Sequence, residues 1–192
     1  MKLFFITAFV FITMATTAQR KISFLSQNYL GLLEGERGSK FQIQTINGLK
    51  YKTWFIGLGT GIDWYFRRSI PTFVSIGKDF LKKGNRNFYV STSAGINFPW
   101  EGDNNYNEWG YSVEKSRSGI YYDAGFGYKI GIGKKNDALL IQLGYSYKHI
   151  SEEARGYIYY MYPLVPDSQE SNSTNRFDYH LRRLSLKIGW NF

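Results

Sequence analysis

One short stretch of this 192-residue chain carries residue types that could perform ester chemistry. His149 and Ser151 stand two positions apart, and Glu152 and Glu153 follow directly. A histidine that takes the proton of a serine hydroxyl, with a carboxylate to orient it, makes a nucleophilic site. In a strand, His149 and Ser151 would share one face with Cα atoms about 7 Å apart, twice the ~3.3 Å rise. The pattern therefore predicts a candidate nucleophile and base, although a polar strand end has the same composition.

The acid that such a site requires has three candidates. Glu152 points to the opposite face of the strand by parity. Glu153 shares the face of Ser151 but stands where the strand is expected to enter a loop. Asp178, on the last strand of the chain, points to the outer face by parity and would complete a set with His149 and Ser151. The sequence leaves these alternatives open.

The remaining titratable residues are expected to be structural. His180 is the second histidine, but its spacing from the acids follows no metal-ligand pattern, so we expect neither a metal nor a cofactor. Six charged residues share the face that is predicted to point inward, where unpaired charges would be costly. We expect them to form ion pairs with one another: Asp63, Asp79, Asp123, Lys129, Lys148 and Lys187.

The start of the chain has the features of an export signal. Lys2 precedes an apolar core at residues 3–14, and small residues occupy positions 15–18. The core is shorter than the roughly 20 residues of a spanning helix, so we expect residues 1–18 to be a signal peptide that is cleaved after Ala18. Residues 19–192 would then form a single domain.

Composition narrows both the class of protein and the class of partner. The chain has no cysteine, which excludes disulfides and thiolate sites, and its 19% aromatic residues and 20 glycines against 4 prolines favour β-structure. Its net charge is +9, from 24 basic and 15 acidic residues. For an exported protein this charge favours anionic lipid headgroups and lipopolysaccharide phosphates as partners over nucleic acid.

Alternation of apolar and polar residues predicts strands along most of the exported chain. The last nine residues show it most clearly, because every second side chain from Leu184 to Phe192 is large and apolar. In residues 53–67 the opposite face is rich in glycine, with Phe55 and Tyr65 as exceptions. The predicted strands are residues 22–34, 39–47, 53–67, 69–81, 87–98, 118–133, 138–151 and 177–192.

The connections between these eight strands fall into two classes. The Asn47-Gly48 pair and two basic segments predict short turns after the second, fourth and sixth strands. Residues 99–117 and 152–176 predict long polar loops after the fifth and seventh strands, and they are rich in acidic residues. Because the number of strands is even, both chain ends should lie at one side and both long loops at the other.

The two faces of the strands are inverted relative to a soluble barrel. A soluble eight-stranded barrel holds its apolar side chains inside, whereas here glycines and charged residues share the face opposite the large apolar ones. Aromatic residues near the strand ends fit two membrane interfaces, and side chains would fill so narrow an interior, so we expect no open pore. The sequence thus predicts an all-β protein, an eight-stranded antiparallel up-and-down transmembrane β-barrel preceded by a cleaved signal peptide.

Over residues 19–192 the chain resembles the small outer-membrane β-barrel proteins of Bacteroidetes. The resemblance implies an outer-membrane location, with both termini in the periplasm and residues 99–117 and 152–176 outside the cell. It also implies a monomer whose C-terminal strand, ending at Phe192, is bound by the barrel-assembly machinery. It rests on Asn47-Gly48, the glycine-rich segment at residues 56–61, Ile70-Pro71, Leu143-Gly144-Tyr145-Ser146-Tyr147 and the terminal Phe192.

A second resemblance concerns His149 and Ser151, which are similar to the His-x-Ser motif of outer-membrane lipid A 3-O-deacylases. It implies an esterase at the interface of the outer leaflet. The chain departs from that family in two places, because Glu152 stands where the family has Asn and the residues around Pro163 include no acid. We therefore expect an integral outer-membrane barrel of structural or surface-interaction type that is not an enzyme, with a lipid A 3-O-deacylase-like esterase as the alternative.

Overall fold

The computed structural model describes residues 22–100, 112–132, 137–155 and 174–192. In this part of the chain the regular structure consists of strands, and no helix is long and apolar enough to cross a membrane. The strands are β1 (Ile22–Gly35), β2 (Gly38–Tyr51), β3 (Trp54–Asp63), β4 (Ser69–Lys83), β5 (Arg86–Pro99), β6 (Ser112–Arg117), β7 (Gly119–Gly131), β8 (Ala138–Arg155) and β9 (Thr174–Asn191).

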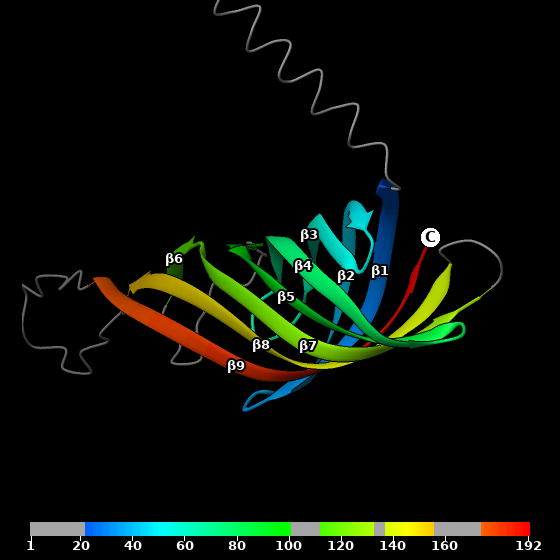
Figure 1. The fold of residues 1–192 in the computed structure, drawn as a ribbon. Coiled ribbons are helices and arrows are strands. Elements are labelled where there is room, and N and C mark those ends of the chain that lie inside the picture. Colours follow the sequence, from blue (N-terminus) through cyan, green and yellow to red (C-terminus); the bar gives the residue numbers. More distant parts are fainter. Residues whose placement is uncertain (1–21, 101–111, 133–136, 156–173) are drawn as a thin grey trace, which may run out of the picture.

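These strands form one antiparallel sheet that closes on itself (Figure 1). Each of β1 to β4 pairs with the next strand in the chain, β5 pairs with β7, and β7, β8 and β9 follow in order. The sheet closes where β9 pairs with β1, with Lys187 opposite Gly31. β6 and β7 are two parts of one strand path, interrupted at Ser118, and both pair with β8. The predicted all-β, eight-stranded antiparallel up-and-down barrel is therefore confirmed.

The barrel has two ends that differ in their connections. At the first, here called the turn end, the chain enters β1 and leaves β9, and backbone hydrogen bonds of 2.9 and 3.1 Å join Ser26 to Phe192. The short β2–β3 and β4–β5 connections lie at the same end. At the other, here called the loop end, lie the β1–β2 hairpin and the points where the chain leaves β5 and β8. Both chain ends of the barrel thus lie on one side, as the even strand number predicts.

The predicted turn at Asn47-Gly48 is wrong. Both residues lie inside β2, where Gly48 is opposite Leu25 of β1 and Gly57 of β3. A Cβ atom on Gly48 would overlap the backbone of β3, so the glycine permits a close approach of two strands and not a reversal. The chain reverses later, at residues 52–53.

Four predicted strand ends also need correction. β3 ends at Asp63 and not at residue 67, and the chain then turns, with Phe66 in the left-handed backbone conformation at a φ of 62°. The predicted loops 99–117 and 152–176 contain strand residues, since β6 pairs with β8, and β8 pairs with β9 without interruption out to Arg155 opposite Thr174. The parts of these loops at residues 101–111 and 156–173 lie outside the described residues.

The apolar and polar faces lie as predicted. Large apolar side chains point outward on every barrel strand, with Leu58 70% and Leu184 61% exposed. The interior contains an aromatic cluster in which small residues make room for large ones, since a side chain on Gly59 would overlap the ring of Phe73. Phe55 belongs to this cluster and not to the outer face. The cluster comprises Leu25, Tyr29, Ile46, Phe55, Phe73, Tyr89, Tyr121 and Leu140.

Candidate functional site

The first group of functional interest is a cluster of charges buried inside the loop end of the barrel. Asp63 forms ion pairs with Arg183 and with Lys148, whose Nζ lies 3.3 Å from Oδ1, and all three side chains are fully buried. Lys148 Nζ also donates hydrogen bonds to the Tyr65 carbonyl oxygen at 2.8 Å and to Ser69 Oγ at 3.0 Å. The hydrogen bonds replace water around the charges, which is what makes such a buried cluster tolerable.

A second set of ion pairs lies inside the barrel toward the turn end. Asp79 accepts hydrogen bonds from Lys50 at 2.7 Å and from Lys129 at 2.9 Å. Nearer the middle of the barrel, Lys187 Nζ lies 2.7 Å from Asp123 Oδ1, and both side chains are buried. The expectation that all six predicted interior charges are paired is confirmed, and the structure adds Lys50 at this end.

Apolar side chains cover the charges at the loop end. Leu33 and Ile150 are fully buried, and Tyr65 and Leu181 are nearly so. Tyr65 also stacks beneath Arg183, whose Cζ lies 5.3 Å from the ring centroid. Arg67 reaches Glu152, which is fully buried, with 2.8 Å between Nε and Oε1. Side chains therefore fill this end of the barrel, as expected for eight strands.

A three-stranded extension carries the residues predicted to do chemistry. β9 pairs with β1 only as far as Arg183, opposite Gly35, but it continues beside β8 for the rest of its length. On the other side of β8 runs β6. The extension therefore consists of β6, residues 147–155 of β8 and residues 174–182 of β9, and it projects past the β1–β2 hairpin (Figure 1).

His149, Ser151 and Asp178 do meet on the outer face of this extension. Ser151 lies directly opposite Asp178 in the β8–β9 register. His149 Nε2 is 3.4 Å from Asp178 Oδ1, and the Ser151 hydroxyl donates a hydrogen bond to the same carboxylate. Arg176, which the sequence did not single out, donates from Nε to Ser151 Oγ at 3.0 Å. Of the three candidate acids, it is Asp178 that touches both residues, whereas Glu152 faces inward.

The order of these contacts differs from that of a nucleophilic triad. In a triad the histidine stands between the serine and the acid, so that it can take the hydroxyl proton. Here Asp178 stands between His149 and Ser151, and the hydrogen bonds of the described residues include none between His149 and Ser151. The Ser151 hydrogen bond, followed by the charge of Arg176, lowers the pKa of Asp178. Ser151 is only 2% exposed, so a substrate carbonyl could not approach its hydroxyl in this conformation.

The second histidine completes a small ring stack beside this group. His180 lies opposite His149, and their ring centroids are 4.9 Å apart. His180 Nδ1 is 2.8 Å from the hydroxyl of Tyr147. Among the described residues, no three His, Cys, Asp or Glu side chains are grouped so that they could hold a metal ion. The two histidines thus pack as paired aromatic residues on neighbouring strands.

The arrangement of the two faces defines the class of protein. A closed antiparallel barrel with large apolar side chains outside and ion pairs inside is of the outer-membrane type. A water-soluble barrel would have its apolar side chains inside and its polar side chains outside. The polar extension stands beyond the apolar band, since Leu184 is the last large apolar residue on the outer face of β9 before Arg182 and His180.

Comparison with one known structure agrees with this class. The fold is similar to the crystal structure of Neisserial surface protein A, NspA, with a TM-score of 0.52 and 12% sequence identity over 89% of this chain and 97% of that chain. A structure from the de novo design of transmembrane β-barrels matches 88% of this chain and 95% of its own, with 15% identity and a TM-score of 0.40. No protein-family model and no curated protein sequence matches the chain. The likeness to NspA concerns the fold alone.

Proposed function

We propose that the protein is an integral outer-membrane barrel of structural or surface-interaction type, without catalytic activity. In this proposal it is a monomer of the kind found in Bacteroidetes, and it is exported by a signal peptide at residues 1–18. Its partners are the lipid and lipopolysaccharide that surround it. Residues 19–192 form the barrel domain, with both termini in the periplasm.

The observation that supports this proposal is the contrast between the two faces of the wall. Inside, Asp63, Lys148 and Arg183 are fully buried and paired with one another. Outside, the mid-strand side chains are large, apolar and exposed, as Leu58 on β3 illustrates. Exposing so continuous an apolar band to water would be costly, whereas lipid chains can cover it at no cost.

The proposed sidedness follows from the ends of the barrel. The short turns lie with the chain ends, and the long connections leave from the opposite end, as in barrels whose short turns are periplasmic. Phe192 ends the chain at the turn end, where its backbone closes the barrel on Ser26. In the proposal, the barrel-assembly machinery binds the last strand there before this closure.

Membrane fractions and gel mobility test the proposed location. The protein should occur in the outer-membrane fraction and run differently on gels before and after heating, because the folded barrel resists cold detergent. Leu58→Arg, which places a charge at the middle of the outward face, should reduce the folded fraction at a cost of about 2–4 kcal/mol. Glu36→Arg in the exposed β1–β2 hairpin is the matched control and should leave the folded fraction unchanged. Recovery as a soluble monomer without detergent would refute the proposal.

A second candidate function rests on one observation, the meeting of His149, Ser151 and Asp178 on the outer face. A lipid A 3-O-deacylase-like esterase would place these residues at the outer-leaflet interface. The position of Asp178 between the other two favours the first proposal. The mass of lipid A from cells with and without the protein distinguishes the two, because deacylation removes one 3-hydroxyacyl chain.

A further inference from the structure

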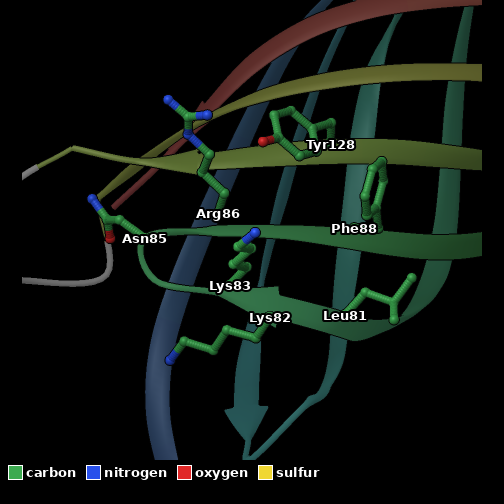
Figure 2. A pocket seen from close by; sticks show the side chains of 7 residues that line it. All are labelled: Leu81, Lys82, Lys83, Asn85, Arg86, Phe88 and Tyr128. Atoms are coloured by element: carbon green, nitrogen blue, oxygen red, sulfur yellow. The ribbon is translucent and has the colours of Figure 1, made fainter.

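An open hollow of about 1030 Å³ lies on the outer surface at the turn end (Figure 2). It faces outward, because Phe88 and Tyr128 have the opposite parity to Tyr89 and Lys129, which are buried inside the barrel. Figure 2 shows side chains from the β4–β5 hairpin on one side and Tyr128 of β7 on the other. The residues that line it are Leu81, Lys82, Lys83, Asn85, Arg86, Phe88 and Tyr128.

The rim of this hollow is strongly positive. Lys82, Lys83 and Arg86 are all exposed, and its lining includes no acidic residue. Within the described residues none of the three cations forms an ion pair. The nearest acid on the same hairpin, Asp79, points inward and is bound by Lys50 and Lys129 instead. Three charges are therefore left for a partner outside the protein to neutralise.

The floor of the hollow is apolar and aromatic. The tilted rings of Phe88 and Tyr128 pack with centroids 4.9 Å apart, and Phe88 stacks on Phe126 at 5.4 Å and on Phe80 at 6.3 Å. Leu81 adds an exposed aliphatic side chain, since its φ of 48° turns it out of the strand where the β4–β5 register shifts. Cations above an aromatic surface at the edge of an apolar band match the headgroup and upper acyl chains of a lipid.

We propose that this hollow binds an anionic phospholipid of the inner leaflet. The lipid phosphate contacts Lys82, Lys83 and Arg86, and its acyl chains lie over Phe88 and Tyr128 along the barrel wall. The inference rests on the proposed membrane location, which places the turn end at the periplasmic interface. The hollow is as large as pockets that hold small molecules, which measure roughly 300–1000 Å³. Charge selects the headgroup, because a zwitterionic lipid offers no net charge to the three cations.

Native mass spectrometry of the refolded protein tests the proposal. The probes are dioleoyl phosphatidylglycerol and dioleoyl phosphatidylcholine in equal amounts in neutral detergent, which differ only in the headgroup. The wild-type protein should retain phosphatidylglycerol over phosphatidylcholine by at least about tenfold, since several basic residues act together. The variant with Lys82→Gln, Lys83→Gln and Arg86→Gln should bring this ratio below about twofold, and Arg86→Gln alone should give an intermediate ratio.

A charge-matched variant and a folding check complete the experiment. Lys40→Gln, Lys115→Gln and Arg182→Gln remove three exposed cations near the loop end and should leave the ratio unchanged. An equal ratio in the wild type, or an equal loss in the control, would overturn the proposal. Each sample is first tested for its heat-dependent gel shift. A wild-type protein without the shift would refute the membrane barrel itself, whereas a folded barrel without lipid preference would refute only the lipid site.

Discussion

The two ends of the barrel treat their charges differently. At the loop end, Asp63, Lys148 and Arg183 are fully buried and neutralise one another, and on the outer face Arg176 lies 3.4 Å from Asp178. At the turn end, the interior pair of Asp79 and Lys50 stays partly exposed, at 16% and 22%. On the outer face of the turn end, Lys82, Lys83 and Arg86 have no acidic partner within the described residues.

The difference separates charges that hold the protein together from charges that face the surroundings. A buried pair whose partner is removed leaves an uncompensated charge in the interior, so the loop-end cluster should dominate stability. Removing the partner of a cation near water costs little folding free energy, because solvent screens the remaining charge. The turn end can therefore present unpaired cations to an external ligand at little cost in folding free energy.

Labelling of single cysteines from outside the cell tests which end of the barrel is external, and it should give an all-or-none result. The chain has no cysteine, so single cysteines can be placed at Glu36→Cys in the loop-end hairpin and at Thr53→Cys in the turn-end β2–β3 turn. A membrane-impermeant thiol reagent added to intact cells should label the first and spare the second. Both should react after the cells are broken, which is the control. Labelling of Thr53→Cys alone in intact cells would reverse the proposed sidedness.

Loss of the loop-end acid should have the largest effect on stability. Asp63→Ala leaves Lys148 and Arg183 buried without their carboxylate, at a cost of about 3–5 kcal/mol in the free energy of unfolding. Urea unfolding followed by tryptophan fluorescence measures it. If the variant does not fold, the heat-dependent gel shift is lost, which agrees with the prediction. A loss below about 1 kcal/mol would contradict the view that this cluster holds the barrel together.

Loss of the turn-end acid should have a smaller effect. Asp79→Ala leaves Lys50 and Lys129 without a partner, but Lys50 is 22% exposed and can turn toward water. The expected loss is about 1–2 kcal/mol, between the values for exposed and buried pairs. The same unfolding measurement, made beside Asp63→Ala, gives the difference directly. Equal losses in the two variants would remove the distinction between the two ends.

Sequence alternation was sufficient to predict the fold, because the wall of a membrane barrel requires an apolar residue at every second position of each strand. Every second residue of a spanning strand faces lipid, so the strands and their inward charges can be read from parity. The turn at Asn47-Gly48 was misplaced because a glycine that allows two strands to approach closely has the same sequence as a turn glycine. The extension was missed because, beyond the apolar band, polar residues such as Arg176 occupy outward positions too, and the alternation disappears.

The interior ion-pair partners show what the alternation of side chains along a strand can and cannot predict. Arg183 has the same parity as Lys187 and lies in the predicted strand 177–192, so parity already points it inward, although it was not among the six predicted interior charges. Lys50 was hidden by the misplaced turn. The hollow at the β4–β5 hairpin could not be predicted, because it depends on the bulge at Leu81 and on the register that sets Phe88 opposite Tyr128, on two strands joined by a long connection. Sequence spacing contains neither feature.

The smallest effect is expected for the residues that first suggested chemistry. His149→Ala and Ser151→Ala each remove one contact of Asp178, and Arg176 remains to pair with its carboxylate. The exposed His149–Asp178 pair contributes about 0–1 kcal/mol and the hydrogen bonds of the buried Ser151 about 0.5–1.5 kcal/mol. Either substitution should therefore change the free energy of unfolding far less than Asp63→Ala does.

Lipid A from cells that overexpress the wild-type protein or either variant should have one and the same mass, because His149 is not bonded to the Ser151 hydroxyl that it would have to deprotonate. An inactive wild type and inactive variants would agree with a structural role for the group. Loss of a 3-hydroxyacyl chain with the wild-type protein, abolished by either substitution, would instead show that His149 and Ser151 act in deacylation. The outer face of the loop end would then be an active site, and its paired charges would serve catalysis and not strand pairing alone.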